Sequence, residues 1–376
     1  TPTHVAQIGL RQVTPVVPTL LHETFGGHLG ITKPTATNGR PLHGWHTTAV
    51  KAANACLLTG DTSYLDLPRG HIERLMELGV VRDPAAEPMS LREHWIGPLT
   101  AAGAGQALFL APYRYGDRGW FDYQPLSPIY PTAMWAVSMD AADWARIEAI
   151  RQEEPLDWRA VGVFRTKEES GHERPWLRYL AGDNPEYPTK MLQAAYGTVC
   201  RRMALIDADQ ADLTQVNIHH WQELNPVVTE ALVQLTLGAP QIVYNGGLLI
   251  CPLRYFDGDR QRPGLPADVA ALVERVSAEQ VVVMLVNLSP FAARRVVVQA
   301  GGFAEHRFTT VSYDRRTSEY PGSQKMYAAP TVTTERVTET VEATTLQVEL
   351  PPATTIKLAL GMARFVNDPT YALPWG

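Results

Sequence analysis

The period of the hydrophobic pattern changes near residue 278, and this change constrains the fold more than any other feature of the sequence. Before it, apolar residues recur at spacings of three and four, as between Ile72 and Leu78, which is typical of amphipathic helices. After it, segments such as VVVMLVNL from Val281 to Leu288 are typical of buried strands. We therefore expect an α+β protein with an α-helical domain over residues 1–278 and an antiparallel β-sandwich over residues 279–376.

The helical part is predicted to consist of antiparallel hairpins. Residues 43–58 form a helix rich in small residues, and Gly60 suits the left-handed position that follows a helix end. Asp61 or Thr62 can then cap the next helix. Apolar spacing predicts further helices over residues 141–152, 189–206, 225–237 and 266–276. In the helix over 189–206 we expect buried side chains at Met191, Leu192, Ala195, Tyr196, Val199 and Met203.

The C-terminal part is predicted to contain short strands separated by turns rich in Gly and Pro. After the strand from Val281, alternating segments predict strands over residues 294–299, 306–313, 339–341, 346–350 and 355–360. Short strands at this spacing are typical of an antiparallel sandwich.

Composition excludes several classes of partner. The formal net charge is −6 and no basic run occurs, so nucleic acid is not an expected partner. No apolar run reaches the roughly 20 residues that span a bilayer, and the pattern of a signal peptide is missing. We therefore expect no membrane partner, and the sequence does not indicate a compartment. The three cysteines match no zinc or redox spacing, and we expect neither a metal nor a cofactor.

Helical hairpins joined by loops that bear Trp, His and acids, followed by a β-sandwich, resemble the (α/α)-toroid carbohydrate-active enzymes. The resemblance is carried by LLTGDTSYL from Leu57, VVVMLVNLSP from Val281 and LPPATTIKLAL from Leu350. It implies a complete or partial toroid and a carbohydrate substrate. A full toroid has about twelve helices, more than the roughly eight that the sequence predicts. We therefore expect an upstream segment or a second chain to complete the ring, or else a shorter, open array.

Three long predicted loops are rich in Trp, Tyr, Pro and His. They cover residues 22–46, 113–130 and 165–188. Because long connections without secondary structure are usually functional, we expect the site to be built from them.

The segment from Asn217 to Asn225 carries the densest group of chemically useful side chains. If it is helical, His219 and Glu223 share a face, and His220 lies beside Asn217. A histidine oriented by a carboxylate is suited to general acid–base catalysis near neutral pH. Trp221 would contact the substrate. The alternative is that these side chains bind loop backbone and stabilise the helices.

Asp122 lies between Trp120 and Tyr123 in a run of aromatic residues. Burial against rings raises the pKa of a carboxyl group, as the general acid of a glycosidase requires. The aromatic rings would pack on the sugar. The alternative is that Asp122 accepts hydrogen bonds from the backbone of its own loop.

Other candidates lie at two helix starts and before a glycine pair. His43, Trp45 and His46 open a helix whose N-terminus supplies N–H donors and partial positive charge, with capping and packing as the alternative roles. Asp183 precedes another helix and is a candidate acid or a cap. Glu23 stands before a glycine pair that permits close approach of the backbone.

These candidates support three readings of function. A glycoside hydrolase needs two carboxylates, which Asp122 together with Asp183, Glu186, Glu23 or Glu223 would supply. A polysaccharide lyase needs a base and a group that neutralises a uronate, which the Asn217–His220 cluster would supply. A carbohydrate-binding or assembly subunit would use the aromatic loops without catalysis. We favour the hydrolase.

Overall fold

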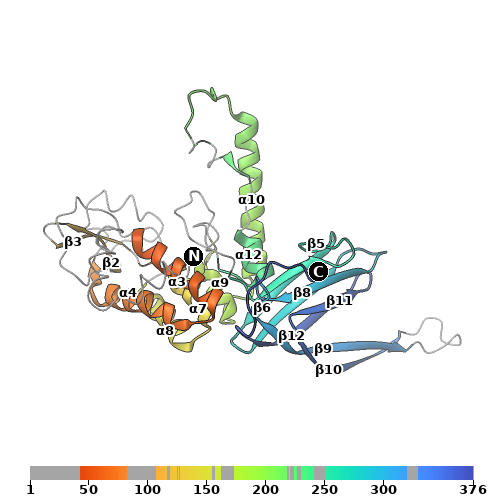
Figure 1. Ribbon diagram of the computed structural model, residues 1–376. Coiled ribbons are helices and arrows are strands. Elements are labelled where there is room, and N and C mark those ends of the chain that lie inside the picture. The colour runs from red at the N-terminus through yellow and green to blue at the C-terminus, as the bar shows by residue number, and fades with distance from the viewer. Residues whose placement is uncertain are drawn as a thin grey trace. The chain divides into compact units, whose positions relative to one another are not determined.

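The computed structural model describes residues 43–82, 107–116, 119–124, 126, 128–154, 157–161, 173–217, 220, 224–226, 230–240, 250–319 and 329–375. The backbone alone is described at 43–50, 113–116, 119–122, 124, 130 and 230. The chain divides into two compact units, Thr1–Ala231 with Pro240–Ile250 and Leu232–Ala239 with Cys251–Gly376. The first unit carries most of the helices and the second carries two antiparallel sheets, in agreement with the predicted α+β class (Figure 1).

The helices of the first unit come largely in hairpins. They are α3 His43–Thr59, the short 3-10 helix η1 Thr62–Leu65, α4 Asp66–Glu77, α7 Ile129–Ser138, α8 Ala141–Glu153, α9 Glu173–Leu180 and α10 Tyr187–Ala208. The helix α12, Glu230–Leu237, starts later than the predicted 225–237 and falls mostly in the second unit.

Two hairpins of the first unit, α3–α4 and α7–α8, share one arrangement. Gly60, with φ of 71°, ends α3, and the Asp61 carboxylate accepts a hydrogen bond from the Ser63 N–H at 2.9 Å, as the sequence predicts. The second hairpin turns at Met139, with φ of 52°, and Asp140 caps α8. Helix α3 packs against α4 and α7, and α8 packs against α7 and α4. The first helices of the two hairpins are therefore neighbours, and so are the second helices.

A buried carboxylate joins α4 to α8. Asp143 is fully buried and accepts hydrogen bonds from Arg69 at 2.9 and 2.6 Å, from Arg146 at 3.0 Å and from Ser138 at 2.6 Å. Burial alone would raise the pKa of Asp143, but the hydrogen bonds from Arg69 and Ser138 hold it below its ordinary value. The ion pairs compensate the cost of burying this charge.

Part of the first unit that was predicted as loop forms regular structure. Strands β1 Val80–Arg82, β2 Leu108–Gly116 and β3 Gly119–Gln124 make a three-stranded antiparallel sheet, so the prediction of a loop over 113–130 was wrong for most of its length. Leu108 and Leu110 alternate along β2 and are buried. Helix α9 likewise lies inside the predicted loop 165–188, where Trp176 and Leu177 are buried.

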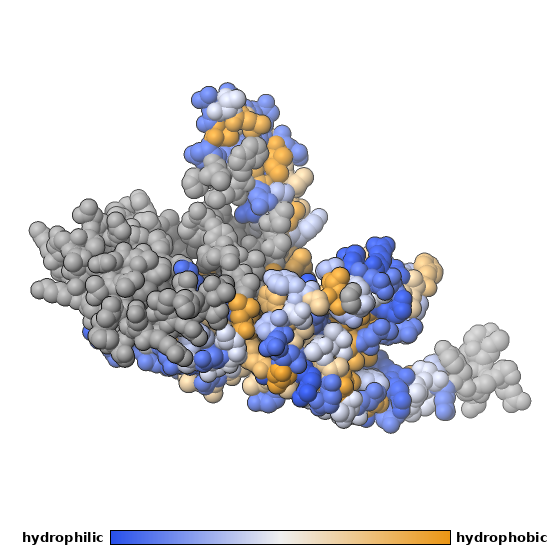
Figure 2. All heavy atoms as spheres, viewed as in Figure 1, coloured by the Kyte–Doolittle hydropathy of each residue, from blue (hydrophilic) through white to orange (hydrophobic). Residues whose placement is uncertain are grey.

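Only one of the six α10 side chains that were predicted to be buried is buried in the structure. Met191 is buried, whereas Leu192, Tyr196 and Met203 are 48%, 72% and 45% exposed. Figure 2 shows apolar residues at the surface of this helix (Figure 2). The prediction of a buried face was wrong for these three residues because Tyr187, Met191 and Thr198 form the buried side instead. Apolar residues lie on both sides of α10, so periodicity alone does not indicate which side is covered.

The described residues of the second unit form nine strands in two antiparallel sheets. They are β4 Leu253–Asp257, β5 Arg262–Pro263, β6 Val269–Val276, β7 Gln280–Asn287, β8 Arg294–Ala300, β9 Arg307–Glu319, β10 Thr331–Ala343, β11 Thr345–Leu350 and β12 Thr355–Ala363. One sheet has the order β10-β9-β12-β7-β6 and the other β11-β8-β4-β5. The strands predicted after residue 279 are confirmed in type and order.

The strand β7 shows why this part of the prediction succeeds. Val281, Val283 and Leu285 are fully buried at alternate positions, and Val281 and Val283 pair with Leu360 and Leu358 of β12. The period of two therefore matches the side-chain alternation of a central strand with one covered face.

The predicted helix over 266–276 was wrong, because this segment forms β6. A bulge between Val273 and Arg275 inserts one residue, so Ala271, Val273 and Val276 all reach the buried face. The spacing of three between Val273 and Val276 therefore imitates a helical period. The predicted division at residue 278 lies between β6 and β7, inside the second unit.

We expect replacement of Asp143 by Asn to lower the free energy of unfolding by about 3 kcal/mol, because two partly buried guanidinium groups lose the buried carboxylate that they share. Since the folded-state pKa of Asp143 is lowered, the stabilisation is present above the unfolded-state pKa of about 4 and is lost as the pH falls through the folded-state value. Urea denaturation at several pH values measures both effects. Glu77→Gln, which removes an exposed pair with Arg74, is the control and should leave the midpoint nearly unchanged. Equal effects of the two variants would contradict the prediction.

Two glycines of the second unit make a matched pair. Gly301 and Gly264 have φ of 87° and 95°, but a Cβ on Gly301 would lie 2.4 Å from the buried Glu305 carboxylate, whereas one on Gly264 meets only an Arg262 nitrogen at 3.5 Å. We expect Gly264→Ala to cost about 1 kcal/mol of backbone strain and Gly301→Ala to cost about 1–3 kcal/mol more through overpacking. Thermal denaturation of the two variants checks the difference, and a smaller loss for Gly301→Ala would refute the predicted clash.

Candidate functional site

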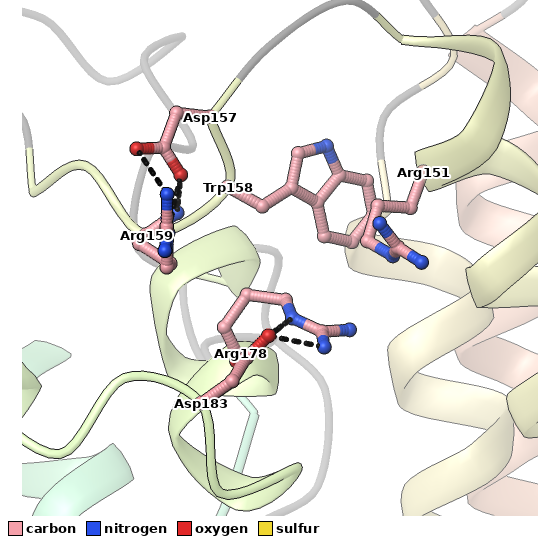
Figure 3. Close-up of a pocket in the computed structure, with 6 residues that line it drawn as sticks. All are labelled: Arg151, Asp157, Trp158, Arg159, Arg178 and Asp183. Carbon is pink, nitrogen blue, oxygen red and sulfur yellow. Dashed lines mark hydrogen bonds and ion pairs between the residues drawn. The ribbon is translucent and has the colours of Figure 1, made fainter.

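An open pocket of about 340 Å³ lies where the ends of α8 and α9 meet, entirely within the first unit. This volume is at the lower end of the range of about 300–1,000 Å³ that ligand pockets occupy. Figure 3 shows the six side chains that line it, which are Arg151, Asp157, Trp158, Arg159, Arg178 and Asp183 (Figure 3).

Local turns bring these side chains together. Gly182, with φ of 87°, ends α9, and the Asp183 N–H donates to the Arg178 carbonyl at 3.0 Å, so the chain turns back over the helix end. The buried Asn184 donates to the carbonyls of Arg159 at 3.3 Å and of Pro175 at 3.1 Å. This amide therefore fixes the turn at residues 157–160 against α9.

The back wall of the pocket is a buried network around Glu154. The Trp158 indole N–H donates to Glu154 at 2.8 Å, and Arg174 donates to the same carboxylate at 2.9 and 2.8 Å. The Arg174 guanidinium also lies 5.7 Å from the centre of the Trp158 ring. Because Trp158 is only 3% exposed, it forms a fixed wall rather than an open stacking surface.

The mouth of the pocket consists of ion pairs between exposed or half-exposed groups. Arg178 donates to both oxygens of Asp183 and, at 2.7 Å, to Glu148, which also accepts from Arg151 at 2.6 Å. Arg159 donates to Asp157 at 2.9 Å. The result is a chain of alternating charges from α8 to the loop after α9.

Asp157 at the mouth is suited to accept hydrogen bonds rather than to donate a proton. The hydrogen bonds from the Arg159 side chain and backbone N–H hold the pKa of Asp157 below its ordinary value. Hydrogen bonding to Asp183 likewise raises the pKa of the Arg178 guanidinium. The pocket therefore supplies fixed acceptors and fixed donors, but a general acid has to come from elsewhere.

Among the predicted site residues whose side chains are described, only Asp183 lines this pocket. Tyr123 lies on β3, packs against the core of the three-stranded sheet and has the Arg82 guanidinium 4.8 Å from its ring centre. These contacts engage Tyr123 in the sheet.

His220 is oriented by a carboxylate that the sequence did not indicate, whereas the predicted pair, His219 with Glu223, lies outside the described residues. The Nε2 atom of the His220 ring lies 2.9 Å from the carboxylate of Asp209, the residue that ends α10. Its backbone N–H donates to the Asn217 carbonyl at 3.1 Å. Hydrogen bonds from the Ala211 N–H and from His220 hold the pKa of Asp209 below its ordinary value. The sequence pointed to Glu223 because it shares a helical face with the neighbouring His219.

Asp183 and the His220–Asp209 pair cannot act on the same bond. Asp183 precedes α10 and Asp209 follows it, and the helix has 22 residues. At 1.5 Å per residue its two ends are about 33 Å apart. The predicted convergence of all candidate side chains on one hollow therefore does not hold for these two groups.

The remaining predicted residues are outside the part of the chain whose side chains are described. Glu23, His219, Trp221 and Glu223 lie outside the described residues, and the backbone alone is described for His43, Trp45, His46, Trp120 and Asp122. Among the described residues, no group of three or more His, Cys, Asp or Glu side chains is placed to hold a metal ion.

Five lining residues were not predicted from the sequence, namely Arg151, Asp157, Trp158, Arg159 and Arg178. For all of them except Arg178, the local sequence contains a pattern that could have indicated the site. Glu148 and Arg151 stand three residues apart on α8, and Asp157, Trp158 and Arg159 follow the helix directly. The contact of Arg178 with Glu148 joins residues 30 apart in sequence, and no local pattern indicates it.

A family model described as a domain of unknown function, DUF8034, matches residues 19–233, and the chain belongs to this family. The matched region includes the whole pocket. No curated protein and no solved structure matches the chain. Within the described residues, none of the helices combines the length and apolar character needed to cross a membrane.

We expect Glu154→Gln to lower the free energy of unfolding by about 3 kcal/mol, because the largely buried Arg174 guanidinium loses the carboxylate to which it is hydrogen-bonded. Asp157→Asn is the matched control, since it breaks a pair with Arg159 that is exposed to solvent, and it should leave the denaturation midpoint nearly unchanged. Chemical denaturation of both variants measures the contrast. A stability loss for Asp157→Asn as large as that for Glu154→Gln would show that the mouth, too, is part of the core.

Proposed function

We propose that the chain is part of a carbohydrate-active enzyme, a glycoside hydrolase that acts on an oligo- or polysaccharide with a pair of carboxylates. The observation that carries this proposal is the pocket at the ends of α8 and α9, where Asp157 and Asp183 stand among three guanidinium groups. A sugar hydroxyl both donates and accepts hydrogen bonds, so such a lining can bind several hydroxyls at once.

The arrangement of the helices supports a toroid. The hairpins α3–α4 and α7–α8 lie side by side with like helices adjacent, which is how repeated hairpins build a ring or a solenoid. We propose that these hairpins belong to a complete or partial (α/α) toroid and that the two sheets of the second unit form the sandwich that follows it.

Within this proposal the two catalytic carboxylates are Asp183 and Asp122, and they have different tasks. Asp183 is held by Arg178 and serves as the ionised group that activates water or attacks the sugar. Asp122 is the proposed proton donor, because aromatic neighbours in the sequence favour its neutral form.

A polysaccharide lyase is the second candidate, and one contact favours it. His220 lies 2.9 Å from Asp209, and a histidine oriented in this way can take a proton from the carbon beside a uronate carboxyl group. In that case Asn217, His219 and His220 would form the site instead of the pocket.

We expect the purified chain to release reducing ends from at least one neutral polysaccharide in a panel that also contains uronate polymers. Asp122→Asn and Asp183→Asn should each lower kcat by at least about a hundredfold while the sugar still binds. Glu77→Gln, which removes an exposed carboxylate that pairs with Arg74 and does not line the pocket, is the control and should keep full activity.

The products separate the alternatives. A lyase leaves an unsaturated uronate that absorbs ultraviolet light, and its appearance would replace the hydrolase by the second candidate. Binding of sugars without turnover on any polymer would instead identify a carbohydrate-binding subunit.

A further inference from the structure

We infer that the pocket at the ends of α8 and α9 takes a neutral sugar through neighbouring hydroxyl groups and rejects the corresponding acidic sugar. The inference rests on the proposed function only in assuming that the ligand is a carbohydrate. It is carried by the charge balance, the remaining hydrogen-bonding groups and the fixed geometry of the mouth.

The charges around the pocket balance. Three guanidinium groups line it, and they are paired with three carboxylates, Asp157, Asp183 and the bridging Glu148. A pocket built for an anion leaves its cations without counter-charges, so that the ligand completes the pairs. Here every guanidinium already has a carboxylate partner, and an added anion would face Asp157 and Asp183 at short range.

Donors and acceptors nevertheless remain for a ligand. Among the described residues, Arg159 donates to Asp157 through Nε and Nη2, so its Nη1 group can still donate to a ligand. Arg151 donates to Glu148 through Nε, so both of its Nη groups can still donate. Each carboxylate oxygen can accept a further hydrogen bond. Adjacent sugar hydroxyls match such mixed edges because each hydroxyl can accept from a guanidinium and donate to a carboxylate.

The geometry of these groups is set before a ligand arrives. Arg178 is held by Asp183 on one side and by Glu148 on the other. The Asn184 amide fixes the Arg159 carbonyl, and Trp158 is locked against Glu154. Binding therefore costs little ordering of side chains, which favours recognition by several weak hydrogen bonds.

Calorimetric titration of the full chain at low salt tests the inference. The probes are the methyl glycosides of glucose, galactose and mannose, each compared with its uronic acid. We expect at least one neutral glycoside to bind about tenfold more tightly than the matching uronate, because the uronate brings a like charge to the mouth.

Two variants move the preference in a defined direction. Asp157→Asn releases Arg159 and leaves the pocket with an uncompensated positive charge, so the ratio of neutral to acidic affinity should fall about tenfold or more. Arg159→Gln should weaken the neutral glycoside about tenfold without any gain for the uronate. Asp183→Asn provides a second test of the reversal if Asp157→Asn melts early. Glu77→Gln, outside the pocket, is the control and should leave both affinities unchanged.

Equal or tighter binding of the uronate by the unaltered chain would overturn the inference. So would an unchanged ratio in both carboxylate variants, or failure to bind any of the hexosides. These failures differ from failure of the proposed function. Hydrolysis that persists undiminished in Arg159→Gln would show an enzyme whose sugar site lies elsewhere, whereas selective binding without turnover would leave the pocket's specificity standing.

Discussion

The pairing of carboxylates with arginines along α8 is the interaction on which the helical unit depends. Asp143, near the start of the helix, is clamped by Arg69 of α4. Glu148 in its middle accepts from Arg178 of α9, and Glu154 at its end accepts from Arg174 of the same helix. One helix thus joins the hairpin before it to the segment after it, and the last two of these contacts build the pocket.

Local patterns predict the parts of this fold that local interactions determine. The turn between α3 and α4 follows from Gly60 and Asp61, and β7 follows from the alternation of Val281, Val283 and Leu285. The segment that forms β6 was misread because a bulge changes the spacing of its buried residues, and a bulge depends on the partner strand. The exposed side of α10 was misread because both its sides are apolar.

The candidate site was predictable only in part, for a related reason. Asp183 attracts attention because it stands in a polar loop before a helix. Its partner Arg178 lies on a segment that the sequence analysis treated as loop. The remaining pocket residues become neighbours only when α8 and α9 pack, and His220 finds Asp209 only because α10 ends there. A sequence shows which chemistry each side chain can perform more readily than it shows which neighbouring side chain will pair with it in the fold.

The contrast between the two halves of the pocket has a consequence for its response to ionic strength. Glu154 and Arg174 are buried, so dissolved ions screen their attraction little, whereas the side chains of Asp157 and Arg159 are 57% and 60% exposed. Raising the salt concentration therefore loosens the rim while the wall behind it keeps its form. A ligand without charge would experience this softening mainly as easier access, since its own attraction to the rim does not depend on long-range fields.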